Sequence, residues 1–191
     1  MAINLLKGGR FDLREEVSTL KNIGIGLGWD MNEGDSGHDF DLDASAFMLI
    51  GNGRIPKDEY FVFYNNLVSP DGAIVHQGDN RVGDEEEGDD ETVFVHLEKI
   101  NPAIEEIVFV VTIDEAQTRK QNFGQVTNAF IRIYDLDTNI NIAQYDLEED
   151  FSTEIAIEFG RLYKRENRWK FKAIGMGFNS GLQGFVDKFV G

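Results

Sequence analysis

Two segments of the chain concentrate carboxylate side chains, and carboxylates at this density favour the binding of a divalent cation. Residues 79–91 contain eight acids and one base, Arg81, and residues 30–43 contain six acids and no base. Together the two segments carry −13 of the net charge of −17. A charge that only kept the protein soluble would be spread over the surface. The two clusters therefore indicate a local role for each.

The donor atoms of these segments favour calcium among the divalent cations. Calcium accepts about six to eight oxygen ligands in flexible geometry, whereas magnesium requires a stricter octahedron. Zinc prefers histidine and cysteine, of which the chain has three and none. We therefore expect Ca²⁺ as the bound cofactor.

The first cluster leads into an alternating stretch at residues 40–47. In a strand, the alternation places Asp41, Asp43 and Ser45 on one face, with the two carboxylates about 7 Å apart. An ordinary antiparallel strand with one face in water shows the same pattern. The alternation alone leaves both interpretations open.

The second cluster has ends that differ from its middle. Asp89, Asp90 and Glu91 immediately precede a strand that begins near Thr92, and Asp79 follows the end of another strand, so ordered backbone holds both ends. The three glutamates at positions 85–87 are typical of a solvated loop tip. We leave these glutamates out of the predicted site.

Convergence of the two clusters would require a cation. Two like charges 4 Å apart cost about 1 kcal/mol in water and about 4 kcal/mol at an effective dielectric constant of 20. Several such pairs would rival the whole stability of a domain, about 5–15 kcal/mol. A bound cation would turn this repulsion into attraction and stabilise the fold.

Apolar alternation predicts that strands position these loops. Helical signals are limited to residues 102–106, 115–121 and 182–190, which are too short for βαβ crossovers. The sequence therefore predicts a mainly β protein, an antiparallel β-sandwich with a few short helices, in a single domain over residues 1–191. The expected strands are residues 23–27, 40–50, 60–64, 73–77, 92–97, 107–113, 129–135, 140–145, 154–163 and 169–177.

Composition excludes several classes of protein. Without cysteine, the chain has no disulfides, thiolate metal sites or cysteine nucleophile. No export signal is recognised at the start of the chain, and no apolar run approaches the ~18 residues of a transmembrane segment. A net charge of −17 disfavours binding to nucleic acid. We expect a cytoplasmic protein without a transmembrane segment.

The sequence does not match two known loop motifs, the EF-hand and the dinucleotide-binding fingerprint. An EF-hand loop starting at Asp137 would place Ile142 where a left-handed backbone is needed, and a β-branched residue is disfavoured there. We predict a hairpin turn instead. The glycine-rich residues 24–28 have Trp29 where a dinucleotide fingerprint needs glycine, and no helix follows, so we predict tight strand packing.

Several longer motifs, in order along nearly the whole chain, identify a family. The chain resembles the TerD-type domain of the tellurite resistance and general stress proteins. The motifs are GLGWD at residues 26–30, FDLDASAF at 40–47, FYNNL at 63–67, GDNR at 78–81, GDDE at 88–91, QNFGQV at 121–126 and WKFKA at 169–173.

This resemblance implies a β-sandwich that binds calcium, as two ions between acidic loops, with no established enzymatic activity. One departure concerns the second loop, where Val82 replaces the family's threonine and residues 84–87 add charge in place of glycines. By motif, the implied metal ligands are Asp30, Asp39, Asp41, Asp43, Asn65, Asn66, Asp79, Asp89, Asp90 and Glu91.

These observations predict a calcium-binding, non-enzymatic stress and tellurite resistance protein. Its metal-ordered loops would form a docking surface for other stress and tellurite resistance proteins, or for the inner face of the membrane through a bridging ion. The alternative is a magnesium- or manganese-dependent hydrolase in which His38 or His76 assists an activated water. Direct tellurium-oxyanion chemistry is disfavoured, because an acidic chain without thiols neither attracts nor reduces an anion.

Overall fold

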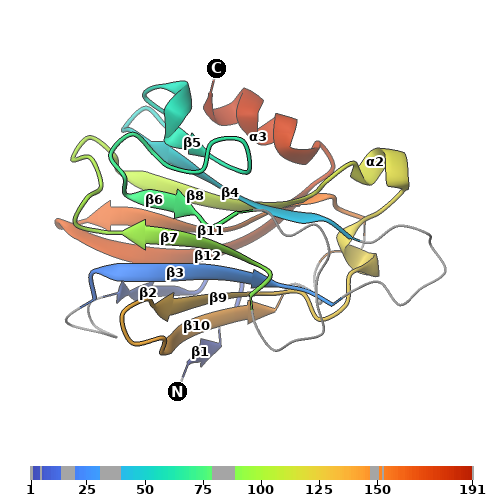
Figure 1. Ribbon diagram of the computed structural model, residues 1–191, viewed down its shortest axis with the longest axis horizontal. Helices are drawn as coiled ribbons and strands as arrows, with labels where there is room; N and C mark the ends of the chain where they lie inside the picture. Colours follow the sequence, from blue (N-terminus) through green and yellow to red (C-terminus); the bar gives the residue numbers. More distant parts are fainter. Residues whose placement is uncertain are drawn as a thin grey trace.

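Two six-stranded sheets are formed by the described residues and pack as a sandwich (Figure 1). The computed structural model describes residues 2–4, 6–13, 20–30, 40–78, 89–146, 151 and 153–190. Sheet A contains, in spatial order, β1 (Ile3–Asn4), β10 (Asn141–Asp146), β9 (Phe130–Asp135), β3 (Asn22–Gly28), β7 (Glu91–His96) and β6 (Ile74–His76).

Sheet B forms the second layer. Its strands, in spatial order, are β2 (Arg10–Asp12), β12 (Arg168–Phe178), β11 (Ala156–Arg165), β8 (Glu106–Ile113), β4 (Leu42–Leu49) and β5 (Phe61–Val62). The helical elements are the 3-10 turns η1 (Asp58–Tyr60) and η2 (Phe123–Gln125) and the α-helices α2 (Ala116–Arg119) and α3 (Gly181–Phe189).

The architecture confirms the predicted antiparallel sandwich with a few short helices. Paired strands run antiparallel except β1 and β10, which are parallel. Alternation buries one face of each sheet in a shared core, as in β3, where Ile23, Ile25 and Leu27 are at most 2% exposed. No helix in the described part of the chain has the length and hydrophobicity that a membrane crossing requires.

The glycines of β3 allow side chains to lie directly on the strand. A Cβ atom at Gly24 would stand 2.1 Å from Cζ of Tyr134, and one at Gly26 would stand 2.2 Å from Cγ of Asp89. Only a residue without a side chain fits there. The prediction that this glycine-rich stretch serves strand packing is confirmed.

Two tight turns connect neighbouring strands, and the first of them was predicted. The carboxylate of Asp135 accepts hydrogen bonds from the Asp137 amide at 3.0 Å and the Thr138 hydroxyl at 2.8 Å, which makes the predicted hairpin between β9 and β10. Glu166 and Asn167 both have positive φ, 52° and 58°, as a two-residue turn between β11 and β12 requires.

Strand β4 is not an ordinary antiparallel strand with one face in water. Both of its faces are buried, with Asp43 6% and Ser45 1% exposed, so the polar face is not bathed in water. Helix α3 covers that face, where the ring centroids of Phe185 and Phe189 lie 6.4 and 5.2 Å from that of Phe47.

The prediction of a helical turn at residues 102–106 is wrong, because the structure has no helical element there. The Ile104 amide donates to the Asn101 carbonyl at 2.9 Å in a tight turn, and β8 begins directly at Glu106. The chain therefore has no room for a helix before it enters the sheet.

Candidate metal centre

The described ends of both acidic segments lie at one end of the sandwich. Strand β3 ends there, and β4 and β7 begin there, on the side where α2 stands (Figure 1). Asp30 follows β3, Asp41 precedes β4, and Asp89 and Asp90 precede β7. The fold therefore brings the two segments to the same edge.

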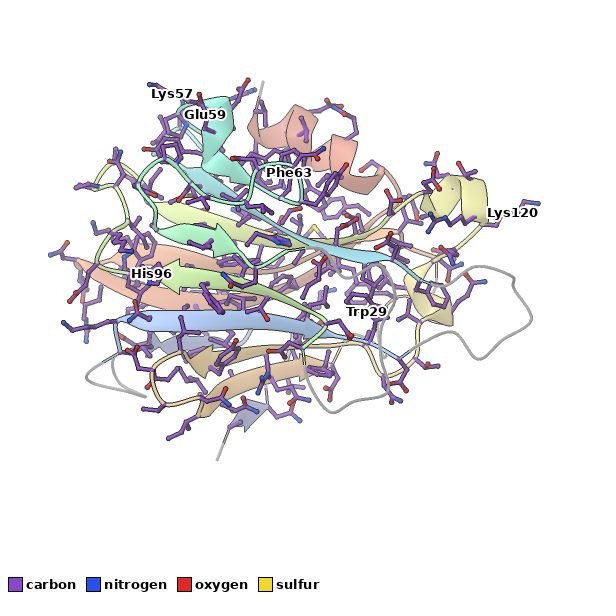
Figure 2. All side chains as sticks on the ribbon, in the orientation of Figure 1. Trp29, Lys57, Glu59, Phe63, His96 and Lys120 are labelled. Carbon is purple, nitrogen blue, oxygen red and sulfur yellow. The ribbon has the colours of Figure 1, made fainter. Side chains whose placement is uncertain are left out.

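Asp90 joins the second acidic segment to the first. Its carboxylate Oδ2 accepts a hydrogen bond from the Trp29 amide at 2.9 Å, and its own amide donates to the Leu27 carbonyl at 2.8 Å. Trp29 is buried at the end of β3 (Figure 2) and donates its indole N–H to the Phe40 carbonyl at 3.2 Å. Through these bonds, Trp29 connects Asp90 of the second acidic segment to Phe40 of the first.

Glu91 ties sheet A to the edge of sheet B. Its Oε2 accepts a hydrogen bond from the Ala44 amide at 2.7 Å, and the Glu91 side chain is fully buried. Strand β5 pairs with β4 at Ala46 and Phe47 and does not extend to Ala44. The Glu91 carboxylate therefore takes the place of a neighbouring strand as the hydrogen-bond acceptor for the Ala44 amide. A buried amide needs such a partner.

His76 completes the same junction. Its Nδ1 accepts a hydrogen bond from the Gly78 amide at 3.1 Å, so Nε2 carries the proton and donates to the Ala44 carbonyl, also at 3.1 Å. The Glu91 carboxylate lies 3.6 Å from Nε2, which is too long for a hydrogen bond. Both ring nitrogens are therefore in use, and His76 is not placed to act as a base in the alternative hydrolase.

Asp89 forms a bidentate ion pair with Arg132 on the outer face of sheet A. The Arg132 Nε and Nη2 atoms lie 2.6 and 2.9 Å from the two carboxylate oxygens, and the Asp89 side chain is 6% exposed. These hydrogen bonds raise the pKa of Arg132 above its ordinary value. Burial raises the pKa of Tyr134, whose ring lies 4.5 Å from the Arg132 guanidinium, and the Asp89 charge adds to the rise.

The described acids of the first segment have different surroundings and do not form one cluster. The Asn128 amide group donates to the Asp30 carboxylate, and the Asp30 amide donates to the Thr127 carbonyl at 3.1 Å. The Asp41 carbonyl accepts from the Asp114 amide at 2.8 Å. Asp43 lines a pocket of about 330 Å³ with residues of α2 and the start of α3, on the outer face of sheet B.

Asn65 and Asn66 lie in the exposed turn that follows β5. The Asn66 side-chain amide donates to the Phe61 carbonyl at 2.6 Å and to the Glu59 carbonyl at 3.1 Å. Its N–H groups therefore hold the turn together. The structure shows no contact of either asparagine with the described acids of β7.

Two predicted ligands, Asp39 and Asp79, lie outside the described residues, and so do the glutamates at 85–87. Among the residues that are described, no group of three or more His, Asp and Glu side chains is arranged to hold a metal ion. The donors at this end of the sandwich are nevertheless carboxylate and carbonyl oxygens, with His76 already bonded. This chemistry fits a hard cation such as Ca²⁺.

The sequence did not predict the structural roles of three side chains in this region. Arg132 anchors Asp89, Asn128 binds Asp30, and His76 supports the junction at Ala44. The sequence gives a weak indication of a role for Arg132, because it is a basic residue within the alternating apolar stretch at 130–135. The other two carry no local pattern, since only the tertiary structure brings them to the acids.

Comparison with known proteins identifies a family. The TerD domain profile matches residues 1–189. Tellurium resistance protein TerD of Serratia marcescens is 50% identical over 182 residues, which cover 95% of this chain and 94% of that protein. General stress protein 16U of Bacillus subtilis (strain 168) is 49% identical over 182 residues, with the same coverage.

A solved structure supports the fold independently. The crystal structure of a homologue of telluride resistance protein (TerD) from Streptomyces coelicolor A3(2) aligns with a TM-score of 0.73 at 22% identity, over 87% of this chain and 95% of that one. The resemblance inferred from the motifs is confirmed. The matching family consists of tellurium resistance and general stress proteins and is not a known enzyme family, in agreement with the prediction of a non-enzymatic protein.

Proposed function

Because this chain belongs to the TerD domain family, we propose that it is a non-enzymatic stress-resistance protein that binds Ca²⁺ at the acidic end of its sandwich. Relatives named for tellurium resistance and general stress support the role in resistance. The absence of thiols argues for an indirect contribution to resistance rather than reduction of tellurite.

The contact between Asp90 and Trp29 carries the calcium proposal. It ties the second acidic segment to Trp29, which immediately precedes the first segment and donates to the Phe40 carbonyl within it, so acids of both segments lie at one edge of the fold. Asp30, Asp41 and Asp90 are the described carboxylates best placed to contribute, and Asp39 and Asp79 are proposed as further ligands from the family motifs alone. Asp89 and Glu91 would reach an ion only by sharing oxygens already bonded to Arg132 and Ala44.

A bound Ca²⁺ supplies positive charge that offsets the repulsion among these carboxylates. We place the protein in the cytoplasm, where the ordered acidic loops dock other stress and tellurium resistance proteins. An ion that also binds anionic lipid would extend this docking to the inner face of the membrane. Two ions per chain are proposed because the resemblance to the TerD-type domain implies two.

Isothermal titration with CaCl₂, after treatment with a chelator, tests the proposal. The parent protein is expected to release or absorb binding heat with a stoichiometry near two. The double change Asp30→Asn and Asp90→Asn should weaken calcium binding by about tenfold or more, because each substitution removes a charged ligand. Each asparagine keeps a side-chain oxygen that can accept the hydrogen bond from Asn128 or from the Trp29 amide.

Asp187→Asn is the matched control, because Asp187 lies on α3, outside both acidic segments, and its carboxylate accepts a hydrogen bond from the Gln183 side chain at 2.8 Å. It should leave the calcium affinity unchanged. Equal binding by the parent and the double variant would disprove the assigned ligands, and an absence of calcium binding by the parent would disprove the function.

A further inference from the structure

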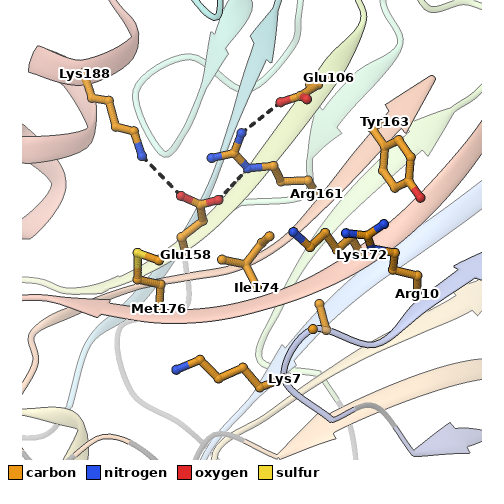
Figure 3. A pocket seen from close by; sticks show the side chains of 12 residues that line it. Lys7, Arg10, Glu106, Glu158, Arg161, Tyr163, Lys172, Ile174, Met176 and Lys188 are labelled. Carbon is orange, nitrogen blue, oxygen red and sulfur yellow. Dashed lines mark hydrogen bonds and ion pairs between the residues drawn. The ribbon is translucent and has the colours of Figure 1, made fainter. Parts of the chain in front are cut away.

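A second charged site, of the opposite sign, lies on the outer face of sheet B. A pocket of about 510 Å³ is bordered by β11, β12, the end of α3 and the turn before β2 (Figure 3). Five cationic and two carboxylate side chains line it, a net charge of +3. Such a patch is unexpected in a chain of net charge −17. It extends from β2 to β8 in sheet B, and the described residues that line it include none of either acidic segment.

Strand register produces this concentration of positive charge. Arg161 of β11 stands directly opposite Lys172 of β12, and Lys172 stands directly opposite Arg10 of β2. Directly opposed residues on neighbouring strands share a face, so three cations form one row across the sheet. Like charges in this arrangement repel each other. The row therefore calls for compensating negative charge.

The protein supplies that compensation to only part of the row. Arg161 bonds Glu158 at 2.5 Å and Glu106 at 2.9 Å, and Lys188 of α3 lies 3.5 Å from Glu158 (Figure 3). Burial disfavours the charged form of Arg161, but the carboxylates outweigh it and raise its pKa. Both carboxylates of the pocket are therefore already used.

The remaining three cations are without carboxylate partners within the described ranges. Lys7, Arg10 and Lys172 form no ion pair with any described residue. Lys7 is nevertheless held at the pocket, because its turn is bonded to β12. The Gly8 amide donates to the Ala173 carbonyl at 2.9 Å, and the Ala173 amide donates to the Gly9 carbonyl at 2.8 Å.

The floor of the pocket is apolar. Ile174 and Met176 of β12 line it, and Met176 is 49% exposed, so its apolar side chain is accessible to a ligand. An apolar floor beneath a cationic border suits a molecule with one anionic and one apolar part. The volume falls within the range of about 300–1,000 Å³ that is typical of small-molecule sites.

We propose that this pocket binds a small organic phosphate monoester. Arg10, Lys172 and Lys7 bind the phosphate, since guanidinium and ammonium groups form charge-assisted hydrogen bonds with its oxygens. The apolar part of the ligand lies on Ile174 and Met176. A small anion fits better than a nucleic acid, because the acidic remainder of the molecule repels an extended polyanion.

Fluorescence titration with 1-naphthyl phosphate, in buffer containing a chelator, tests the proposal. The chelator prevents a metal ion from bridging the phosphate to the acidic loops, so the result is independent of the calcium proposal. We expect saturable binding of 1-naphthyl phosphate, weaker binding of inorganic phosphate and none of 1-naphthol. Increasing NaCl should weaken the binding.

Variants at the unpaired cations assign the site. Lys172→Gln should weaken binding by about tenfold, and addition of Arg10→Gln and Lys7→Gln should weaken it further, because each removes a charged hydrogen bond. None of these changes breaks an ion pair of the described structure, so the variants should remain folded. Lys57→Gln and Lys120→Gln, at exposed lysines that do not line this pocket (Figure 2), form the matched control and should bind as the parent does.

Vesicles of phosphatidylcholine with phosphatidic acid distinguish a lipid headgroup from a soluble phosphate. Sedimentation with these vesicles that is lost in Lys172→Gln would assign the phosphate to a lipid. Binding to 1-naphthyl phosphate alone would assign it to a soluble metabolite. The proposal is overturned if neither probe binds, or if the triple variant binds either probe as tightly as the parent.

Discussion

Single carboxylates at the acidic end are already bonded to donors of the protein itself. Asp89 shares both oxygens with Arg132, Asp90 accepts from the Trp29 amide, and Glu91 accepts from the Ala44 amide. These bonds fix the position at which the second acidic segment enters β7. In the proposed calcium site, Asp89 and Glu91 would hold the end of the second acidic segment in place, and Asp90 between them would offer oxygens to the ion.

The position of Asp89 depends on the absence of a side chain at residue 26. Gly26→Ala would place a Cβ atom 2.2 Å from the Asp89 Cγ atom, and the carboxylate cannot yield without losing Arg132. We expect the free energy of unfolding to fall by about 1–3 kcal/mol, as for other overpacked sites. Urea denaturation in the presence of a chelator measures this change.

Gly51→Ala is the matched control for that prediction. The nearest atoms that a Cβ atom there would meet belong to the carboxylate of exposed Glu105, at 3.3 Å, and that side chain can move. The change in stability should stay within about 0.5 kcal/mol. Equal effects of the two substitutions would show that the contact between residue 26 and Asp89 is not a constraint.

At the scale of elements, the junction between β4 and β7 connects the two sheets beside the candidate metal centre. The edge of β4 at Ala44 is closed by side chains from sheet A instead of by a neighbouring strand. This arrangement couples the start of β7 to the start of β4. An ion bound between the acidic segments would therefore stabilise both sheets together.

Removal of the Glu91 carboxylate tests this coupling. Glu91→Ala would leave the buried Ala44 amide without its acceptor, at a cost of about 1–3 kcal/mol in the free energy of unfolding. Glu91→Gln retains an acceptor oxygen and should cost less. Hydrogen exchange at the Ala44 amide, measured without metal, should be fastest in Glu91→Ala.

Glu98→Ala provides the reference for that series. Glu98 pairs with Lys21 at 3.2 Å on an exposed surface, where such pairs contribute at most about 1 kcal/mol. It should leave the exchange of Ala44 unchanged. The same rate of exchange at Ala44 in all three variants would rule out a structural role for the carboxylate.

Most of the fold could be predicted because the strands follow alternation that is visible in the sequence. Apolar residues with a period of two mark β3, β7 and β9 clearly, and their edges match to within a few residues. Strands β1 and β2 were missed, because they have only two and three residues. Their pairing with β10 and β12 is a tertiary interaction that no local pattern encodes.

The candidate site was less predictable than the fold. Clustered charge identified the acidic segments, and the structure brings their described ends together through Asp90. The charge pattern could not show which carboxylates are taken by protein donors, because Arg132 lies 43 residues from Asp89 in the sequence. The basic pocket was not predicted for a related reason, since Arg10, Arg161 and Lys172 come from three different strands and meet only through strand register.

At the scale of the whole molecule, charge is segregated rather than balanced. An acidic end and a basic pocket occupy different parts of the sandwich, and the net charge remains −17. Net repulsion of this size destabilises the compact state. Salt should relieve it, because the Debye length falls from about 30 Å at 0.01 M to about 8 Å at 0.15 M.

We therefore expect Tm to rise with NaCl when divalent ions are removed by a chelator. A gain of about 1 kcal/mol would correspond to about 2–4 °C for a chain of this size. The triple change Lys7→Gln, Arg10→Gln and Lys172→Gln lowers the net charge from −17 to −20 and should make the rise steeper. If chloride bound in the basic pocket were the cause instead, the same variant would respond less than the parent. Thermal unfolding of both proteins across the salt series separates general screening from local anion binding, and a Tm that is independent of salt would contradict a destabilising role for the net charge.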